Sequence, residues 1–181
     1  HAETPYNSDG TYNLNLNVKT VLNKKCALQV SLFYKNKVIR REEIKHCRKE
    51  NRINFTSLSV KEWSAEIPNL YTLVLTLKNG DRTVETVGKK IGFKHIEIKG
   101  NVFYFNNKPI KLLGVNHHDT NPKTGYYMTV KDMEKDVKLF KQYNMNCVRT
   151  SHYPPDPVFL DLCDKYGIYV IDEADIECHG V

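Results

Sequence analysis

The sequence lacks any apolar run approaching the roughly 18 residues of a membrane-spanning helix, and it shows no signal-peptide pattern. It also lacks a C-x-x-C pair: its 5 cysteines are widely spaced and odd in number. A disulfide framework or a structural zinc site is therefore not expected, and reduced thiols favour a cytoplasmic protein. The lack of a spanning run predicts no membrane partner. Cys147 and Cys163 stand in apolar surroundings, which predicts that they fill a core.

Acidic residues are fewer than basic ones, with 21 Asp and Glu against 27 Lys and Arg and a net charge of +6. Binding of nucleic acid would require that positive charge to be clustered. The lysines are instead scattered among acids, and the densest basic run, residues 45–49, is flanked by Glu43 and Glu50. The sequence therefore predicts no nucleic-acid partner and indicates a solvated, lysine-rich surface.

Helical periodicity is missing before Phe93, where short runs alternate apolar and polar side chains with the period of half-buried strands. The clearest run is "YNLNLNV" at residues 12–18, and "NGD" at residues 79–81 is a strong hairpin turn. Further strands are predicted at residues 26–34, 38–44, 52–58, 71–77 and 83–93, with a tight turn at 36–37. This series favours an antiparallel β-sandwich of immunoglobulin-like type over residues 1–95; another small β fold is the alternative. Trp63, the single tryptophan, is expected at a sandwich edge or an interface.

The periodicity changes after Phe93. A β-hairpin is predicted over residues 94–110, with a turn at Asn106 and Asn107. Three strand-like runs then alternate with two amphipathic helices: strands at 110–115, 146–151 and 168–172, and helices at 130–143 and 156–167. The helices carry end signals at Thr129, Asp132, Asp156, Pro157 and Gly167. This βαβαβ order requires a parallel sheet with right-handed crossovers.

Polar residues gather just past each predicted parallel strand. They are Asn116, His117, His118 and Asp119 after the first strand, Arg149, Ser151 and His152 after the second, and Asp172, Glu173, Asp175, Glu177 and His179 after the third. Because the carboxyl ends of parallel strands share one edge, where α/β enzymes hold their chemistry, the three stretches are expected to converge. Each stretch alone also fits a structural role, such as an ion-pair network of Asp172 and Glu173. Their joint occurrence favours a functional site.

Glu177 and His179 stand two residues apart, so in an extended chain both side chains point the same way. A carboxylate and an imidazole could then reach one cation, and this mixed pair suits magnesium, manganese or zinc. Two ligands do not complete a site, and an ordinary surface loop is the alternative. Cys178 faces the other way and is not counted as a ligand or a nucleophile.

Five stretches occur here in one order: "WSAEIPNLYTLVLTL", "VGKKIGFKHIEI", "FYFNNKPIKLLGVNHHD", "FKQYNMNCVRTSHYP" and "LCDKYGIYVIDEADIECHG". In this combination the chain resembles glycoside hydrolase family 2, most closely its bacterial β-galactosidases, from about residue 60 to residue 181. The resemblance implies an immunoglobulin-like sandwich followed by the first three βα units of an incomplete (β/α)8 TIM barrel, at residues 96–181. It also implies retaining hydrolysis of terminal non-reducing β-D-galactose residues by two glutamates.

The resemblance further implies roles for individual residues. His118 in "GVNHHD" and His152 in "SHYP" match histidines that contact the sugar and stabilise its oxocarbenium-like transition state. Glu177 and His179 in "ECHG" match two ligands of an active-site Mg²⁺. Positions that support the site rather than react are matched by Asn116, Asp119 and Arg149. The sequence departs from its relatives at Cys178, where they have Thr, and at His117, where they have Arg.

Both reacting glutamates lie on later barrel strands in the family, so neither is expected within these 181 residues. The chain is therefore expected to be an inactive piece of a larger enzyme, and its unpaired strands predict self-association. The parent is expected to be a homo-oligomer that takes a β-galactoside such as lactose. Three alternatives stay open: another family 2 glycosidase (β-glucuronidase or β-mannosidase), a non-catalytic carbohydrate-binding or structural module, and a piece that complements the rest of the enzyme.

Overall fold

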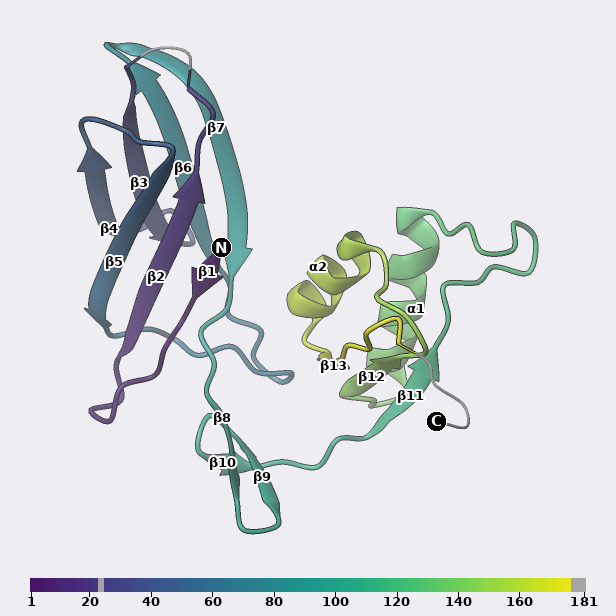
Figure 1. Ribbon diagram of the computed structural model, residues 1–181. Helices are drawn as coiled ribbons and strands as arrows, with labels where there is room; N and C mark the ends of the chain where they lie inside the picture. Colours follow the sequence, from purple (N-terminus) through teal and green to yellow (C-terminus); the bar gives the residue numbers. More distant parts are fainter. Residues whose placement is uncertain (23–24, 177–181) are drawn as a thin grey trace. The chain divides into compact units, whose positions relative to one another are not determined.

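The computed structural model describes residues 1–22 and 25–176, and the chain folds as two compact units (Figure 1). The first unit comprises His1–Glu62 and Asn69–Ile96, and the second comprises Trp63–Pro68 and Glu97–Val181. The sequence placed the whole of residues 1–95 in the sandwich, whereas the short segment Trp63–Pro68 belongs to the second unit. No helix in the described part of the chain combines the length and the apolar character of a membrane span.

The first unit is a sandwich of two antiparallel sheets. One sheet has the order β1-β2-β5, with β1 at Ala2–Glu3, β2 at Tyr12–Lys19 and β5 at Glu50–Leu58. The other has the order β4-β3-β6-β7, with β3 at Ala27–Tyr34, β4 at Lys37–Ile44, β6 at Tyr71–Asn79 and β7 at Arg82–Ile91. Along β2 the side chains of Tyr12, Leu14 and Leu16 are buried and the intervening asparagines are not. The predicted immunoglobulin-like sandwich is confirmed.

Two hairpin turns of the sandwich follow from local backbone chemistry. Asn79 pairs with Arg82 across a two-residue loop that begins with Gly80 at φ +57°, so the predicted turn at this place is confirmed. The turn between β3 and β4 lies at residues 35–36 instead of 36–37. Tyr34 pairs directly with Lys37, which makes Lys37 the first residue of β4.

The second unit begins with a small antiparallel sheet of order β10-β9-β8, with β8 at Ile96–Lys99, β9 at Val102–Phe105 and β10 at Lys108–Pro109. Asn106 and Asn107 have φ values of 50° and 60° and join β9 to β10. Two successive positive φ values are typical of the tight hairpin turn that asparagine tolerates. The predicted turn at this asparagine pair is confirmed.

The rest of the second unit is a parallel sheet of order β11-β12-β13 connected by two helices (Figure 1). In chain order these elements are β11 (Gly114–His117), α1 (Val130–Gln142), β12 (Cys147–Thr150), α2 (Pro157–Tyr166) and β13 (Tyr169–Ile171). A capping box of Thr129 and Asp132 opens α1, and Asp156 caps α2 as predicted. Val137, Phe159 and Ile168 are fully buried in the core of this unit. The βαβαβ arrangement is therefore confirmed.

The first parallel strand starts later than its apolar run suggested. Residues 110–113 are not in the ladder, because several of their backbone groups are bound elsewhere. The Asn146 side chain accepts from Leu113 N (2.8 Å) and donates to Lys111 O (3.0 Å), and Ile110 N donates to Phe103 O of the preceding hairpin (3.1 Å). The strand begins at Gly114, where a Cβ would lie 2.2 Å from Cys147 O. Only glycine allows this close approach to β12. The shift places Asn116 and His117 inside the strand instead of after it.

Trp63 is 3% exposed and lies within the second unit. Its indole N–H donates to Asp164 O at 2.8 Å, and its ring lies against Phe105 and Tyr169, with centroids 5.9 and 5.7 Å away. Lys141 Nζ donates to the carbonyl oxygens of Ala65 (2.9 Å) and Gly167 (3.0 Å). These hydrogen bonds hold the segment Trp63–Pro68 against α1 and the end of α2. Fluorescence of this single tryptophan therefore reports the unfolding of the second unit.

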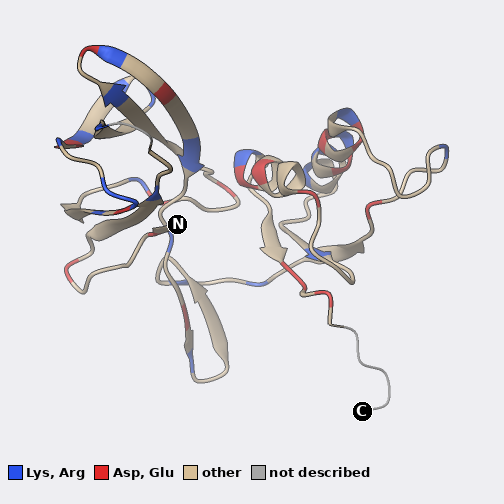
Figure 2. Ribbon diagram, turned by 45° about the horizontal axis from the view of Figure 1, so that its top comes forward, with Lys and Arg blue, Asp and Glu red and all other residues tan. Residues whose placement is uncertain are grey.

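Basic and acidic residues intermix along α1 and α2 (Figure 2), and one group of them links the two helices. Glu134 of α1 accepts hydrogen bonds from the Tyr166 hydroxyl and, at 3.1 Å, from Lys165 Nζ. These two hydrogen bonds lower the pKa of Glu134 from its ordinary 4.5 to about 2. The folded-state pKa is thus below the unfolded value, so the stabilisation is complete above pH 4.5 and is lost as the pH falls through about 2.

We expect Glu134→Gln to lower the stability of the second unit at neutral pH and to flatten its pH dependence between about 4.5 and 2. Urea unfolding followed by Trp63 fluorescence at several pH values measures both effects. Asp161→Asn, on the exposed surface of α2, is the matched control and should behave as the wild type. Identical pH profiles for Glu134→Gln and the wild type would contradict this assignment.

Candidate functional site

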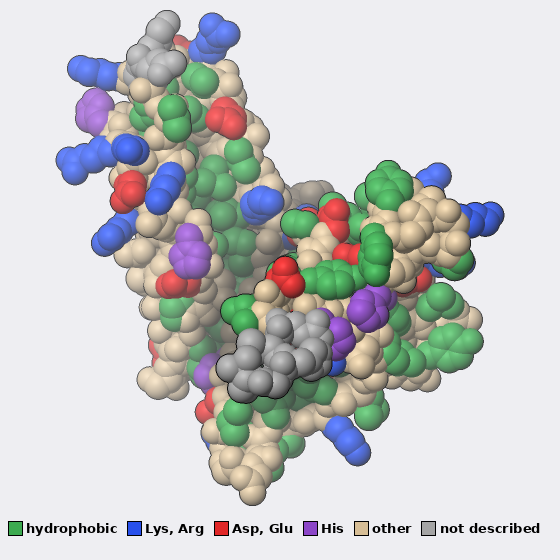
Figure 3. Space-filling model, turned by 45° about the vertical axis from the view of Figure 1, so that its right-hand side comes forward, with side chains coloured by type: hydrophobic (Ala, Val, Ile, Leu, Met, Phe, Trp, Pro, Cys, Tyr) green, Lys and Arg blue, Asp and Glu red, His purple; other side chains and the backbone are tan. Residues whose placement is uncertain are grey.

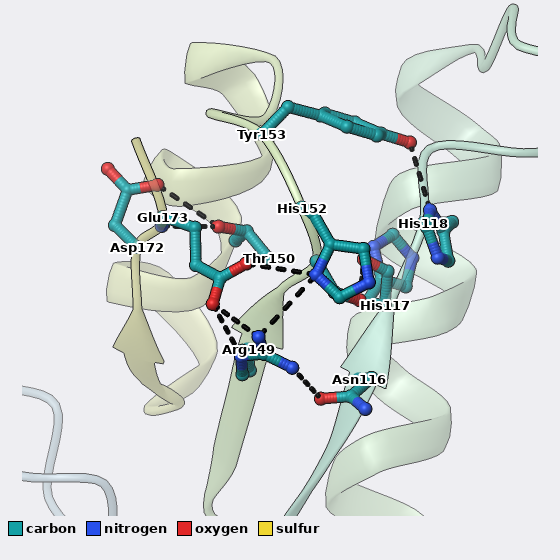
Figure 4. A network of polar contacts seen from close by, with 10 residues as sticks. Asn116, His117, His118, Arg149, Thr150, His152, Tyr153, Asp172 and Glu173 are labelled. Atoms are coloured by element: carbon teal, nitrogen blue, oxygen red, sulfur yellow. Dashed lines mark hydrogen bonds and ion pairs between the residues drawn. The ribbon is translucent and has the colours of Figure 1, made fainter. Parts of the chain in front are cut away.

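Polar side chains from all three parallel strands meet at the carboxyl edge of the sheet (Figure 4). In the ladder Asn116 of β11 lies opposite Arg149 of β12, and Arg149 lies opposite Ile171 of β13. This register sets Asn116 and Arg149 side by side, and Arg149 Nη1 donates to Asn116 Oδ1 at 3.2 Å. The predicted convergence of the first two polar stretches is therefore present.

The third stretch joins them through Glu173, two residues after β13. Arg149 donates to Glu173 Oε1 from Nε at 2.6 Å and forms an ion pair with it from Nη2 at 2.5 Å. His152 Nδ1 lies 3.2 Å from Glu173 Oε2. The Glu173 backbone N–H donates to Thr150 Oγ1 at 3.0 Å, and the Thr150 hydroxyl donates to Asp172 Oδ1 at 3.2 Å. Glu173 thus connects β12 to β13 at the edge where the strands end.

The charge state of Glu173 follows from these contacts. Burial raises the pKa of its carboxyl, but the hydrogen bonds of Arg149 and His152 and the positive charge of Arg149 outweigh burial and hold the pKa below its ordinary value. A general acid has to carry a proton near neutral pH, which such a carboxylate does not. Glu173 is therefore a fixed negative charge in this site and not a proton donor.

His118 and His152, the two histidines predicted to bind a sugar, lie side by side. Their ring centroids are 5.6 Å apart at an interplanar angle of 78°. Tyr153 orders the first of them, because its hydroxyl lies 3.4 Å from His118 Nδ1 and accepts from Asp119 N at 3.0 Å. Figure 3 shows histidine side chains reaching the surface of the second unit, with hydrophobic side chains around them. Both rings are thus held at the same edge of the sheet.

Asp119 ties the segment after β11 to α2. Its Oδ2 accepts from Asp156 N at 3.3 Å, and its Oδ1 is buried without a hydrogen-bond partner among the described residues. His117 Nδ1 lies 3.7 Å from that oxygen. The side chain thus holds the loop rather than facing the histidine pair.

His117 does not join the polar cluster. Because it is the last residue of β11, its side chain points opposite to that of Asn116 and enters the helix-side core. The ring stacks on Phe159 at 4.6 Å and 10°, and Nε2 lies 3.1 Å from Asp136 Oδ2. The expectation that His117 converges with the other polar residues is wrong, for the reason that it lies in the strand and not after it.

The proposed metal ligands Glu177 and His179, together with Cys178, lie outside the described residues. Within residues 1–22 and 25–176 no group of three or more His, Cys, Asp or Glu side chains is arranged to hold a metal ion. Cys147 and Cys163 are buried, and burial raises the pKa of each thiol, that of Cys163 to about 12. These two cysteines are core residues, as predicted.

Two residues of the cluster had been given no role in the sequence interpretation. Its place two residues after β13 puts Glu173 among the converging polar residues, but the sequence gives it no partner other than a structural ion-pair network, and it does not mark Glu173 as the acceptor for Arg149 and His152. Tyr153 follows His152 without any polar pattern that marks it. A parallel sheet with polar groups at its carboxyl edge is the arrangement in which β/α proteins, barrels and open sheets alike, place their binding sites.

Comparison with known protein families identifies the family to which the chain belongs. Residues 1–94 match the family model "Glycosyl hydrolases family 2", and residues 96–181 match "Glycosyl hydrolases family 2, TIM barrel domain". The chain belongs to glycosyl hydrolase family 2.

The relatives of the chain include proteins named Beta-galactosidase. That of Streptococcus thermophilus is 47% identical over 131 residues, which cover 72% of this chain and 13% of that protein. That of Priestia megaterium is 51% identical over 124 residues, 67% of this chain and 12% of that protein. The chain thus spans about an eighth of the length of these curated relatives.

Solved structures give the same fold. The Beta-Glucuronidase of Parabacteroides merdae has a TM-score of 0.81 at 25% identity, covering 94% of this chain and 22% of that chain. A glycosyl hydrolase family 2 member from Bacteroides cellulosilyticus has a TM-score of 0.80 at 26% identity, covering 96% of this chain and 24% of that chain.

Proposed function

We propose that the chain is part of a retaining β-galactosidase, a hydrolase that removes terminal non-reducing β-D-galactose residues. The observation that carries the proposal is the cluster of His118, Arg149, His152 and Glu173 at the carboxyl edge of the parallel sheet. The names of curated relatives at 46 to 51% identity support galactose as the sugar. β-Glucuronidase is less favoured, because solved structures that bear this name, such as those from Parabacteroides merdae and Ruminococcus gnavus, are only 25% and 24% identical.

The described residues have binding roles in this proposal. His118 and His152 contact hydroxyl groups of the galactosyl residue and stabilise the positive charge that develops on its ring. Arg149 and Asn116 support the site through their mutual hydrogen bond, and Asp119 fixes the loop that carries His118. A retaining glycosidase also needs an acid/base and a nucleophilic carboxylate roughly 5–5.5 Å apart. We assign neither role to a described residue, since Glu173 is an ion-paired carboxylate.

We propose that Glu177 and His179 hold a Mg²⁺ ion. A carboxylate oxygen with an imidazole nitrogen is a donor set that a divalent cation accepts when water completes its coordination. When bound, the ion supplies positive charge next to the sugar. The further proposals are a homo-oligomeric parent, a β-galactoside such as lactose as substrate, and a cytoplasmic location. The free thiols of Cys26, Cys47, Cys147 and Cys163 support a reducing compartment.

A hybrid enzyme tests the proposed function. In the Streptococcus thermophilus Beta-galactosidase, the stretch that aligns with this chain is replaced by the aligned residues of this chain, 72% of its length. We expect the hybrid to hydrolyse a nitrophenyl β-galactoside within about tenfold of the parent rate, a difference of about 1.4 kcal/mol, and not to hydrolyse the matching β-glucuronide. The host with the segment deleted gives the background.

The 181-residue chain alone is expected to hydrolyse neither substrate. Three results would overturn the proposal: failure of the hybrid to hydrolyse the galactoside, preference of the hybrid for the glucuronide, or turnover of the galactoside by the purified chain.

A further inference from the structure

Glu173 is the acceptor shared by the side chains of Arg149 and His152. Its Oε1 takes both the Nε and the Nη2 groups of Arg149, and its Oε2 lies 3.2 Å from His152 Nδ1 (Figure 4). The side chain of Glu173 is 25% exposed, whereas those of Arg149 and His152 are 37% and 43% exposed. The Glu173 side chain is therefore less exposed than the two side chains that it binds.

The contact with Glu173 fixes which nitrogen of His152 carries the proton. An ionised carboxylate only accepts hydrogen bonds, so a nitrogen at 3.2 Å from it has to be an N–H donor. The competing neighbour of the same nitrogen is Arg149 Nη2, which only donates and lies farther away, at 3.5 Å. The Nδ1–H form satisfies the shorter of the two contacts.

Nε2 of His152 is then the atom left for a ligand. Among the described residues it has no hydrogen-bond partner, and the half-exposed ring leaves it accessible. In the neutral Nδ1–H ring this nitrogen carries a lone pair and accepts a hydrogen bond. Within residues 1–22 and 25–176, the charged or titratable groups that face the ring are Glu173, Arg149 and His118, whose ring centroid is 5.6 Å away.

We propose that Glu173 is a positioning residue of the galactoside site: it fixes His152 as the Nδ1–H tautomer and holds Arg149 beside it, so that Nε2 of His152 accepts a hydrogen bond from a sugar hydroxyl. This inference rests on the proposed function for the identity of the ligand. The tautomer and the ion pair belong to the chain itself and are measurable without any sugar. A partner acid that orients a ligand-binding imidazole through its second nitrogen is a common arrangement in protein sites.

Long-range ¹H–¹⁵N NMR spectra of the 181-residue chain test the proposal at a pH where the ring is neutral. In the wild type we expect the ¹⁵N shift of His152 Nδ1 in the range of a protonated ring nitrogen and that of Nε2 in the range of an unprotonated one. Glu173→Ala removes the acceptor, and the population should move toward the Nε2–H form. Glu173→Gln retains an oxygen acceptor and should keep more of the Nδ1–H form than Glu173→Ala does.

Asp172→Asn is the matched control, since Asp172 is the adjacent acid and accepts from Thr150 instead of His152. Its tautomer should equal that of the wild type, and Trp63 fluorescence shows whether each variant keeps its fold. A wild-type His152 that is mainly Nε2–H would overturn the proposal, and this measurement needs no substitution. An unchanged tautomer in folded Glu173→Ala would overturn it as well. Failure of the hybrid to hydrolyse a galactoside refutes the proposed function and leaves the tautomer result standing, so the two failures are distinguishable.

Discussion

Replacing His152 by alanine in the hybrid galactosidase is expected to lower kcat for a nitrophenyl β-galactoside by about 10²–10³-fold, the usual loss when one preorganised charge-stabilising group is removed. The physical reason is that Glu173 and Arg149 hold the ring at the carboxyl edge before a ligand arrives. A group that is already oriented contributes mainly to the transition state, so kcat should fall more than KM rises. Steady-state kinetics of the hybrid and its variant measure the split.

Tyr143→Ala is the control for this experiment. Tyr143 is 70% exposed at the end of α1 and has no part in the polar cluster, so its replacement should leave kcat unchanged. A loss confined to KM in His152→Ala would assign the imidazole to ground-state binding only. Equal losses in the two variants would show that the effect is not specific to the cluster.

Replacing Phe159 by alanine is expected to destabilise the second unit by about 3–5 kcal/mol, the range for a fully buried phenylalanine. Phe159 is 0% exposed and lies in the core formed by α1, α2 and the parallel sheet, where its ring stacks on His117. The cavity left by the ring would be lined by packed neighbours that can relax only in part. Urea unfolding followed by Trp63 fluorescence measures the loss in this unit.

Leu139→Ala is the control for the core prediction, because Leu139 is on α1 but 37% exposed. Its loss should be well below that of Phe159→Ala, since more than a third of Leu139 stays exposed to water in the folded state, whereas Phe159 is fully buried. A loss below about 1 kcal/mol for Phe159→Ala would contradict the account of this core.

Most of the fold was readable from local patterns. The two-residue period of "YNLNLNV" assigns Tyr12, Leu14 and Leu16 to one face, and the observed burial follows it. Helix boundaries followed equally well, because caps such as Thr129 and Asp156 satisfy backbone groups that the helix leaves open. These features depend on chemistry within a few residues, which a sequence displays directly.

The errors arose where distant residues decide the local structure. The apolar run at residues 110–113 is not a strand, because a side chain from residue 146 binds its backbone. The segment Trp63–Pro68 belongs to the second unit through contacts of Trp63 with Phe105 and Asp164. No sequence pattern near Trp63 predicts these contacts. Contacts between residues so far apart depend on the tertiary fold and leave no periodic signal.

The candidate site was predictable in outline and not in detail. The parallel topology alone brings Arg149 and His152 near the end of β11, because adjacent strands end at one edge. The place of His117 depended on the strand boundary, since one residue along a strand reverses the direction of the side chain. The choice of Glu173 as the acceptor for both Arg149 and His152 depends on side-chain rotamers. Such choices are visible only in three dimensions.

The most direct test of the central claim is a crystal structure of the hybrid enzyme with a galactose-configured inhibitor. The account predicts that the sugar lies at the carboxyl edge of β11–β13, with Nε2 of His152 about 2.7–3.2 Å from a sugar hydroxyl and His118 in contact with the same sugar. A sugar bound away from both histidines, or one that meets His152 through Nδ1, would contradict it.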